Sequence, residues 1–158
     1  MPARSAIEIL KHDHKEAKGL FEKILTTDDD AECERLYEEL ARELRIHVAV
    51  EKDVFYPRIL EELGDKIPQD IIDHQEKEES ESPEMLDQLD TIEDDDEWME
   101  TFREFRDTVL EHAVAVEEGK LFPLVERSMS REDLQELGRE MEERKNELKS
   151  EYERPAER

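Results

Sequence analysis

The stretch His47–Pro57, HVAVEKDVFYP, has a near copy in His112–Pro123, HAVAVEEGKLFP. In each copy a histidine is followed by a glutamate, Glu51 in the first and Glu117 in the second. Each glutamate precedes the proline of its copy by six residues. The chain therefore has two similar halves, and each half provides an imidazole and a carboxylate within one short segment.

A further histidine lies upstream of each copy, His14 before the first and His74 before the second. Histidine and carboxylate side chains are ligands of borderline first-row metals. A twofold set of them is what a two-metal centre inside a helical bundle requires. The pattern indicates a non-haem di-metal protein, with iron as the favoured metal and zinc or manganese as alternatives.

The composition favours an all-α protein. In 158 residues there are only 4 glycines and 6 prolines, which leaves little room for a sheet. Apolar residues recur at steps of three and four, as on the buried face of a helix. Short loops between four such segments predict an up-down-up-down four-helix bundle with an additional C-terminal helix. The expected helices span about 5–25, 31–63, 68–90, 98–128 and 130–152. The expected division is 1–128 for the bundle and 129–158 for the C-terminal helix and a frayed tail, packed on the bundle or on a partner chain.

Four of the histidines fall on the apolar lines of the four bundle helices. A buried imidazole loses its hydration and must find a partner. A single core histidine is more often a structural residue that hydrogen-bonds a neighbour. Antiparallel packing, however, brings the middles of all four helices together, which favours a shared metal site. The four are His14, His47, His74 and His112.

The glutamates follow the same logic. His47 and Glu51 are four residues apart, so they lie on nearly the same face of a helix. His112 and Glu117 are five apart, which indicates one inserted residue. A π-bulge absorbs one extra residue, and we predict one between Val109 and Glu117. Glu51 and Glu117 are then expected to bridge two metals, whereas in a regular helix Glu117 would face solvent.

Three further positions leave alternatives open. Glu78 lies one turn beyond His74 and either completes the second metal or is one more exposed acid in a charged run. His12 is on a different helical face from His14, so we expect it to be exposed or to hydrogen-bond a ligand. Tyr56 and Tyr37 could hydrogen-bond ligands, but aromatic packing explains them equally well.

The net charge of −25, from 48 acidic and 23 basic side chains, argues against binding to nucleic acid or to anionic membranes. No segment is apolar enough to span a bilayer or to act as a signal peptide. The single Cys33 cannot form an internal disulfide, so a reducing cytoplasm is the expected compartment.

The segment Leu10–His14, the two copies and His74 together resemble the hemerythrin-like (HHE cation-binding) domain over about residues 5–127. The resemblance implies a left-handed four-helix bundle around an oxo- or hydroxo-bridged di-iron centre. It also implies four histidines as terminal ligands and two glutamates as bridges: His14, His47, His74, His112, Glu51 and Glu117.

One position departs from the oxygen-carrying members, which have a further histidine where this chain has Glu78. The resemblance therefore specifies the site better than the activity. The leading interpretation is a di-iron protein that binds or senses dioxygen, peroxide or nitric oxide, with catalase-like peroxide turnover as one form of it. The alternatives are a non-redox iron or zinc binding and handling module, and an acidic helical interaction protein with structural histidines. The oligomeric state stays open.

Overall fold

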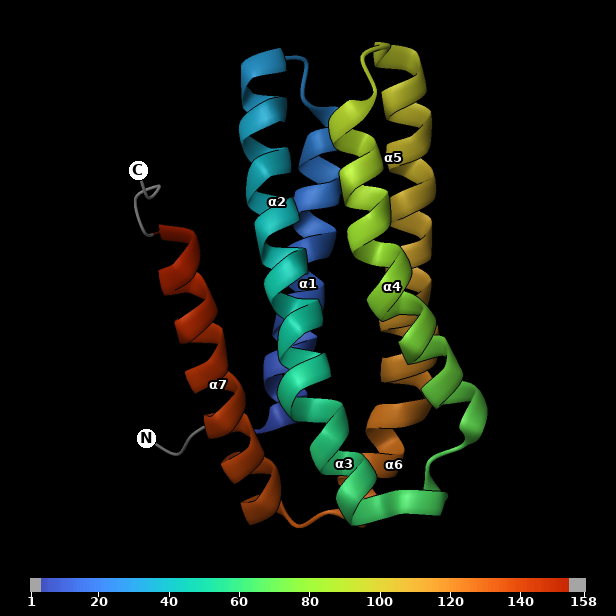
Figure 1. Ribbon diagram of the computed structural model, residues 1–158, viewed down its shortest axis with the longest axis vertical. Helices are drawn as coiled ribbons and strands as arrows, with labels where there is room; N and C mark the ends of the chain where they lie inside the picture. Colours follow the sequence, from blue (N-terminus) through green and yellow to red (C-terminus); the bar gives the residue numbers. More distant parts are fainter. Residues whose placement is uncertain (1–3, 154–158) are drawn as a thin grey trace.

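The computed structural model describes residues 4–153, and every regular element in that range is a helix. Four antiparallel columns form a bundle, and a fifth helix crosses its outside (Figure 1). The predicted all-α fold, an up-down-up-down bundle with an additional C-terminal helix, is confirmed. The elements are α1 (Ala6–Thr26), α2 (Asp30–Val50), the π-helical η1 (Glu51–Phe55), α3 (Tyr56–Leu63), the 3₁₀ turn η2 (Gly64–Lys66), α4 (Gln69–Thr91), α5 (Asp95–Leu110), the π-helical η3 (Glu111–Leu121), α6 (Phe122–Ser128) and α7 (Arg131–Glu153).

Polar side chains cap the starts of α1, α2, α5 and α7. The Ser5 hydroxyl accepts a hydrogen bond from the Glu8 backbone N–H, and the Glu8 carboxylate accepts one from the Ser5 N–H. Asp94 accepts from the Glu97 N–H at the start of α5. At the start of α7, the Ser130 hydroxyl accepts a hydrogen bond from the backbone N–H of Asp133 at 3.1 Å. Such caps satisfy backbone donors that have no partner within the helix.

The apolar core consists of two clusters separated along the bundle. One cluster contains the start of α1, α3, α6 and α7, with Leu10 and Phe122 among its fully buried members. The other contains the second half of α1 and the facing parts of α2, α4 and α5, with Phe21 and Phe105 fully buried. His14 lies between them on α1, one turn after Leu10. A polar layer therefore separates the two halves of the core at mid-height.

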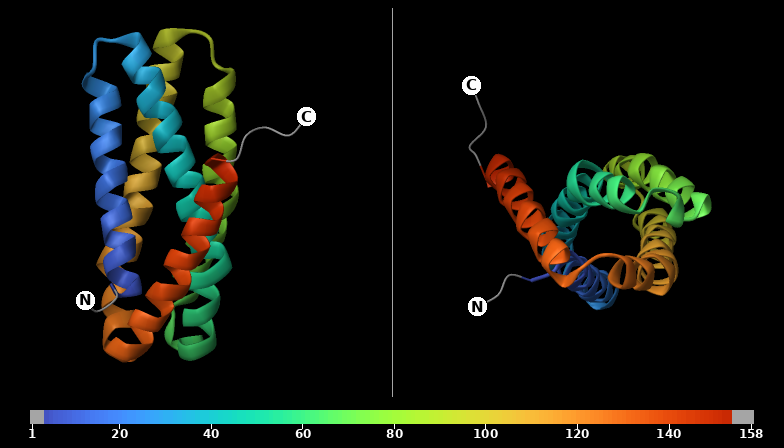
Figure 2. Two further views of the ribbon diagram at one scale, coloured as in Figure 1. Left: turned by 90° about the vertical axis from the view of Figure 1, so that its left-hand side faces the viewer. Right: turned by 90° about the horizontal axis from the view of Figure 1, so that it is seen from below.

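Helix α7 lies on the outside of the bundle along α1 and α2 (Figure 2). Leu134, Leu137 and Met141 are its buried apolar residues. Gly138 packs so closely on the start of α1 that an added Cβ would clash with the Arg4 carbonyl oxygen. The expected tail beyond this helix falls outside the described residues. None of the described helices has the length and apolar character needed to cross a bilayer.

Candidate metal centre

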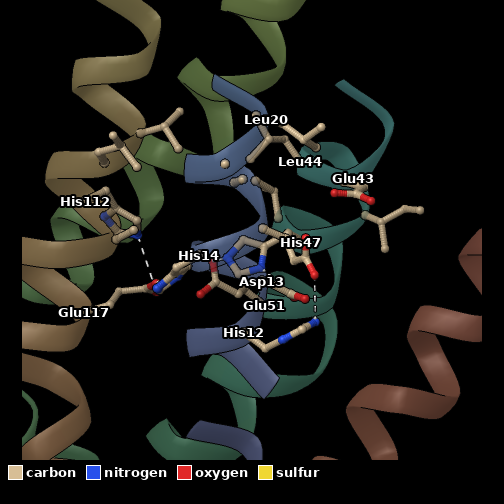
Figure 3. A pocket seen from close by; sticks show the side chains of 18 of the residues that line it. His12, Asp13, His14, Leu20, Glu43, Leu44, His47, Glu51, His112 and Glu117 are labelled. Atoms are coloured by element: carbon tan, nitrogen blue, oxygen red, sulfur yellow. Dashed lines mark hydrogen bonds and ion pairs between the residues drawn. The ribbon is translucent and has the colours of Figure 1, made fainter. Parts of the chain in front are cut away.

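Four side chains from three of the bundle's columns converge in the polar layer (Figure 3). They are His14 from α1, His47 from α2, Glu51 at the start of η1 and Glu117 from η3. One donor atom from each lies within 4.8 Å of the others. His47 is the most exposed of the four side chains, at 13%. Two imidazoles and two carboxylates at this spacing are suited to hold a first-row metal ion.

Three donor atoms in this cluster, His14 Nε2, Glu51 Oε2 and Glu117 Oε1, are buried and make no well-formed hydrogen bond among the described residues. His14 Nε2 and Glu117 Oε1 lie 3.0 Å apart, so they are close enough to share one ion. An unpaired buried polar atom costs about 1–3 kcal/mol, and more when it carries charge. Three such atoms in one place would all be satisfied by a single cation. The residues present therefore fit a metal ion.

The two carboxylates interact strongly with each other. Burial raises the pKa of Glu51 well above its usual range, and the neighbouring Glu117 carboxylate raises it further. Burial would also raise the pKa of Glu117, but the neighbouring Glu51, His112 and His14 side chains hold it well below its usual range. Without a cation, burial and the repulsion between the two carboxylates favour protonation of Glu51 over Glu117. A bound cation would favour ionisation of both.

A carboxylate orients each imidazole of the cluster. The Nδ1 atom of His14 lies 2.7 Å from Glu118 Oε2, and the Nδ1 atom of His47 lies 3.0 Å from Asp13 Oδ2. When Nδ1–H donates to the carboxylate, the Nε2 lone pair is left to face the cluster. Neither Asp13 nor Glu118 was predicted from the sequence. Each adjoins a ligand in sequence, but Asp13 contacts the histidine of the neighbouring helix rather than His14, and the sequence carries no signal for this.

Two π-helical segments turn the glutamates inward. The predicted π-bulge is confirmed, because the π-helical segment η3 begins at Glu111, inside the interval between Val109 and Glu117. The second segment, η1, divides the expected helix over 31–63 and was not predicted. The backbone N–H of Tyr56 donates to Glu51 O, and that of Phe122 donates to Glu117 O, each across five residues. The internal repeat is therefore preserved in the backbone as well as in the sequence.

A buried tyrosine contacts the second glutamate. The Tyr56 hydroxyl donates a hydrogen bond to Glu117 Oε2 at 2.7 Å. Burial and the Glu117 carboxylate raise the pKa of Tyr56 well above its usual range. Tyr37 instead donates to the Leu86 carbonyl, in the apolar cluster farther along the bundle. Of the two tyrosines considered from the sequence, only Tyr56 contacts the site.

His112 and Glu78 lie beside the four-residue cluster. The Nε2 atom of His112 is 3.5 Å from Glu117 Oε2 and 2.9 Å from the amide oxygen of Gln75. Glu78 is 7% exposed. It lines a cavity of about 320 Å³ that the four residues of the cluster and His112 also line. Burial and the Glu117 carboxylate raise the pKa of Glu78 to about 7, although His112 lowers it. Glu78 is therefore a buried cavity residue and not an exposed acid.

His74 does not share the buried line of its helix, contrary to the sequence expectation. Helix α4 buries Gln75 instead, and His74 lies partly exposed one residue earlier. Its ring stacks on His112, with the two Nδ1 atoms 2.8 Å apart. His12 is exposed, as expected, and its Nε2 lies 3.3 Å from Glu16.

Comparisons with known proteins point to a cation-binding family. The sequence model of the hemerythrin HHE cation binding domain matches residues 5–125. A solved structure, a hemerythrin HHE cation binding domain-containing protein from Mycobacterium kansasii, superposes with a TM-score of 0.78 at 25% identity, over 94% of this chain and 89% of that one. A DNA nickase from Nostoc sp. is 25% identical over 142 residues, which are 89% of this chain but 39% of the nickase. The chain thus spans less than half the length of that relative.

Proposed function

Since the chain belongs to the hemerythrin HHE cation-binding family, we propose that it holds a di-iron centre and binds or senses a small oxidant. The oxidant would be dioxygen, peroxide or nitric oxide. The observation that carries the proposal is the convergence of three buried donor atoms, on His14, Glu51 and Glu117, that make no well-formed hydrogen bond among the described residues. A folded chain retains such a cluster at a cost in stability that a bound cation would offset.

The described residues suggest how two ions would be held. The first would take His14 and His47 together with the two glutamates. The second would take His112 and Glu78, which line the same cavity beside Glu117. Glu51 and Glu117 would be shared between the two ions. His74 would join the second ion by giving up its contact with the His112 ring.

A bound iron pair would supply the redox chemistry for oxidant binding or for catalase-like peroxide turnover. The chain supplies the surroundings. The cavity has room for a small molecule, and apolar side chains that include Leu20, Leu44 and Val109 form part of its wall. The Tyr56 hydroxyl holds a proton at Glu117 Oε2.

A non-redox iron or zinc module is a second candidate, and one observation favours it. Only four of the proposed ligands converge within 4.8 Å, and two histidines with two glutamates would supply the four ligands that one Zn²⁺ needs. His74 lies away from this set. A single redox-silent ion would then be the resident metal.

Metal analysis after anaerobic reconstitution with Fe²⁺ tests the proposal. We expect two irons per chain and near-ultraviolet absorption after exposure to air. The Glu117→Gln variant should lose both irons, whereas Glu111→Gln, an exposed position in the same segment, should keep them. Oxygen evolution on addition of hydrogen peroxide would distinguish turnover from binding. One zinc per chain with no stable iron would favour the second candidate, and a protein that retains no metal would overturn both.

A further inference from the structure

A chain of polar contacts connects the C-terminal helix to the metal cluster. The Lys145 Nζ atom on α7 lies 2.6 Å from Asp13 Oδ1, and the other oxygen of Asp13 lies 3.0 Å from His47 Nδ1. The side chains of Lys145, Asp13 and His47 are only 16%, 17% and 13% exposed. Solvent therefore screens these contacts less than it would at the surface.

We propose that Lys145 is a positioning residue for cation binding: it holds the Asp13 carboxylate in the orientation that aims His47 Nε2 at the metal. The inference rests on the proposed function, because it assigns a further residue to the same site. It gives the C-terminal helix a role in the metal centre that neither the internal repeat nor the four bundle columns supply.

Asp13 needs a cationic partner because acids surround it. Glu16, Glu39 and Glu43 line the same cavity. Burial and the neighbouring Glu39, Glu16 and Asp13 carboxylates raise the pKa of Glu43. Burial alone would raise the pKa of Asp13 as well, but His47 and Lys145 hold it well below its usual range. Without Lys145, repulsion from these acids would favour rotation of Asp13 toward solvent and away from His47.

Helix α7 is held firmly enough to place this lysine. Leu137 and Met141 are fully buried, and Gly138 packs against the start of α1. The preceding residue, Arg144, lies 3.1 Å from Asp53. Asp53 belongs to η1, the segment that begins with Glu51. Two adjacent side chains of α7 thus contact the residue that orients His47 and the segment that carries Glu51.

The main test compares Lys145→Met with Lys149→Met, using Zn²⁺ as a redox-silent probe in competition with a chelator. Lys149 is exposed, one turn farther along α7, and also lines the cavity. Removing a positive charge near a cation site should by itself strengthen binding. Positioning predicts the opposite sign for Lys145: a dissociation constant about tenfold higher, the lower end for partners that orient ligands. Lys149→Met should leave binding unchanged or tighter, and Lys145→Arg should retain native affinity.

A double-mutant cycle tests whether Lys145 acts through Asp13. Asp13→Asn should itself weaken Zn²⁺ binding, and adding Lys145→Met to it should have little further effect. A tenfold loss from Lys145→Met in the Asp13→Asn background would overturn the proposal. Native or tighter Zn²⁺ binding by Lys145→Met would overturn it as well.

Nitrogen-15 NMR of the His47 ring in the metal-free protein separates this inference from the proposed function. The native ring should carry its proton on Nδ1, and Lys145→Met should disturb this tautomer while Lys149→Met does not. If the native protein binds no Zn²⁺ and no Fe²⁺, the proposed function fails. A His47 signal that is the same in native protein and Lys145→Met would overturn the positioning role.

Discussion

Replacing Glu78 with glutamine should stabilise the metal-free protein at alkaline pH. Burial raises the pKa of Glu78 from 4.5 to about 7. Between these values the folded chain binds more protons than the unfolded chain, so the free energy of unfolding falls as pH rises. The difference corresponds to about 3 kcal/mol once both states are ionised. Glutamine does not titrate, so the Glu78→Gln variant should escape this loss.

Urea denaturation in the presence of a chelator, at intervals from pH 4 to pH 8, measures the effect. The stability difference between Glu78→Gln and native protein should grow in favour of the variant across this range, most steeply between pH 5 and pH 7. Glu76→Gln is the matched control, because it removes one exposed carboxylate from the same helix. Parallel stability curves for Glu78→Gln and native protein would refute the reasoning. If Glu78 is a ligand, the metal-bound Glu78→Gln variant should be less stable than metal-bound native protein, since glutamine would weaken metal binding.

Three further predictions concern packing and charge. Tyr56→Phe removes the hydrogen bond to the buried Glu117 and should lower the stability of the metal-free protein by about 1–3 kcal/mol in thermal denaturation. Gly138→Ala should lower the free energy of unfolding by about 1–3 kcal/mol, because the new Cβ meets the Arg4 carbonyl. Gly19→Ala has open space around the new Cβ and should instead raise the free energy of unfolding by up to about 1 kcal/mol. Equal effects of the two substitutions would contradict the packing described. The melting temperature should rise with added salt, because a net charge of −25 repels itself; a flat response up to molar salt would exclude this.

Much of the fold and part of the site could be predicted from the sequence, because both depend on local periodicity. The seam of the first helix predicted that His14 is buried, and the repeat predicted an inward-facing Glu117 despite its irregular spacing. Both depend on spacing within one helix. The count of one extra residue between His112 and Glu117 was also sufficient to predict the π segment.

The remaining features depend on how elements rotate and pack against each other. Whether α4 buries His74 or Gln75 depends on a rotation of about 100°, and the apolar residues of this charged helix are too sparse to specify it. The contact between Lys145 and Asp13 joins residues 132 positions apart. It depends on which side of the bundle α7 covers. A lysine and an aspartate in a chain that is 45% charged give no sign of such pairing.

The division of the core has a consequence for how the protein handles its ion. Apolar packing secures the bundle on both sides of the polar layer, so neither end relies on the metal for its cohesion. Binding and release of a cation would then require movement of only a few side chains in the polar layer, while the rest of the molecule stays folded. Such a protein could exchange its cargo repeatedly without passing through an unfolded, aggregation-prone state.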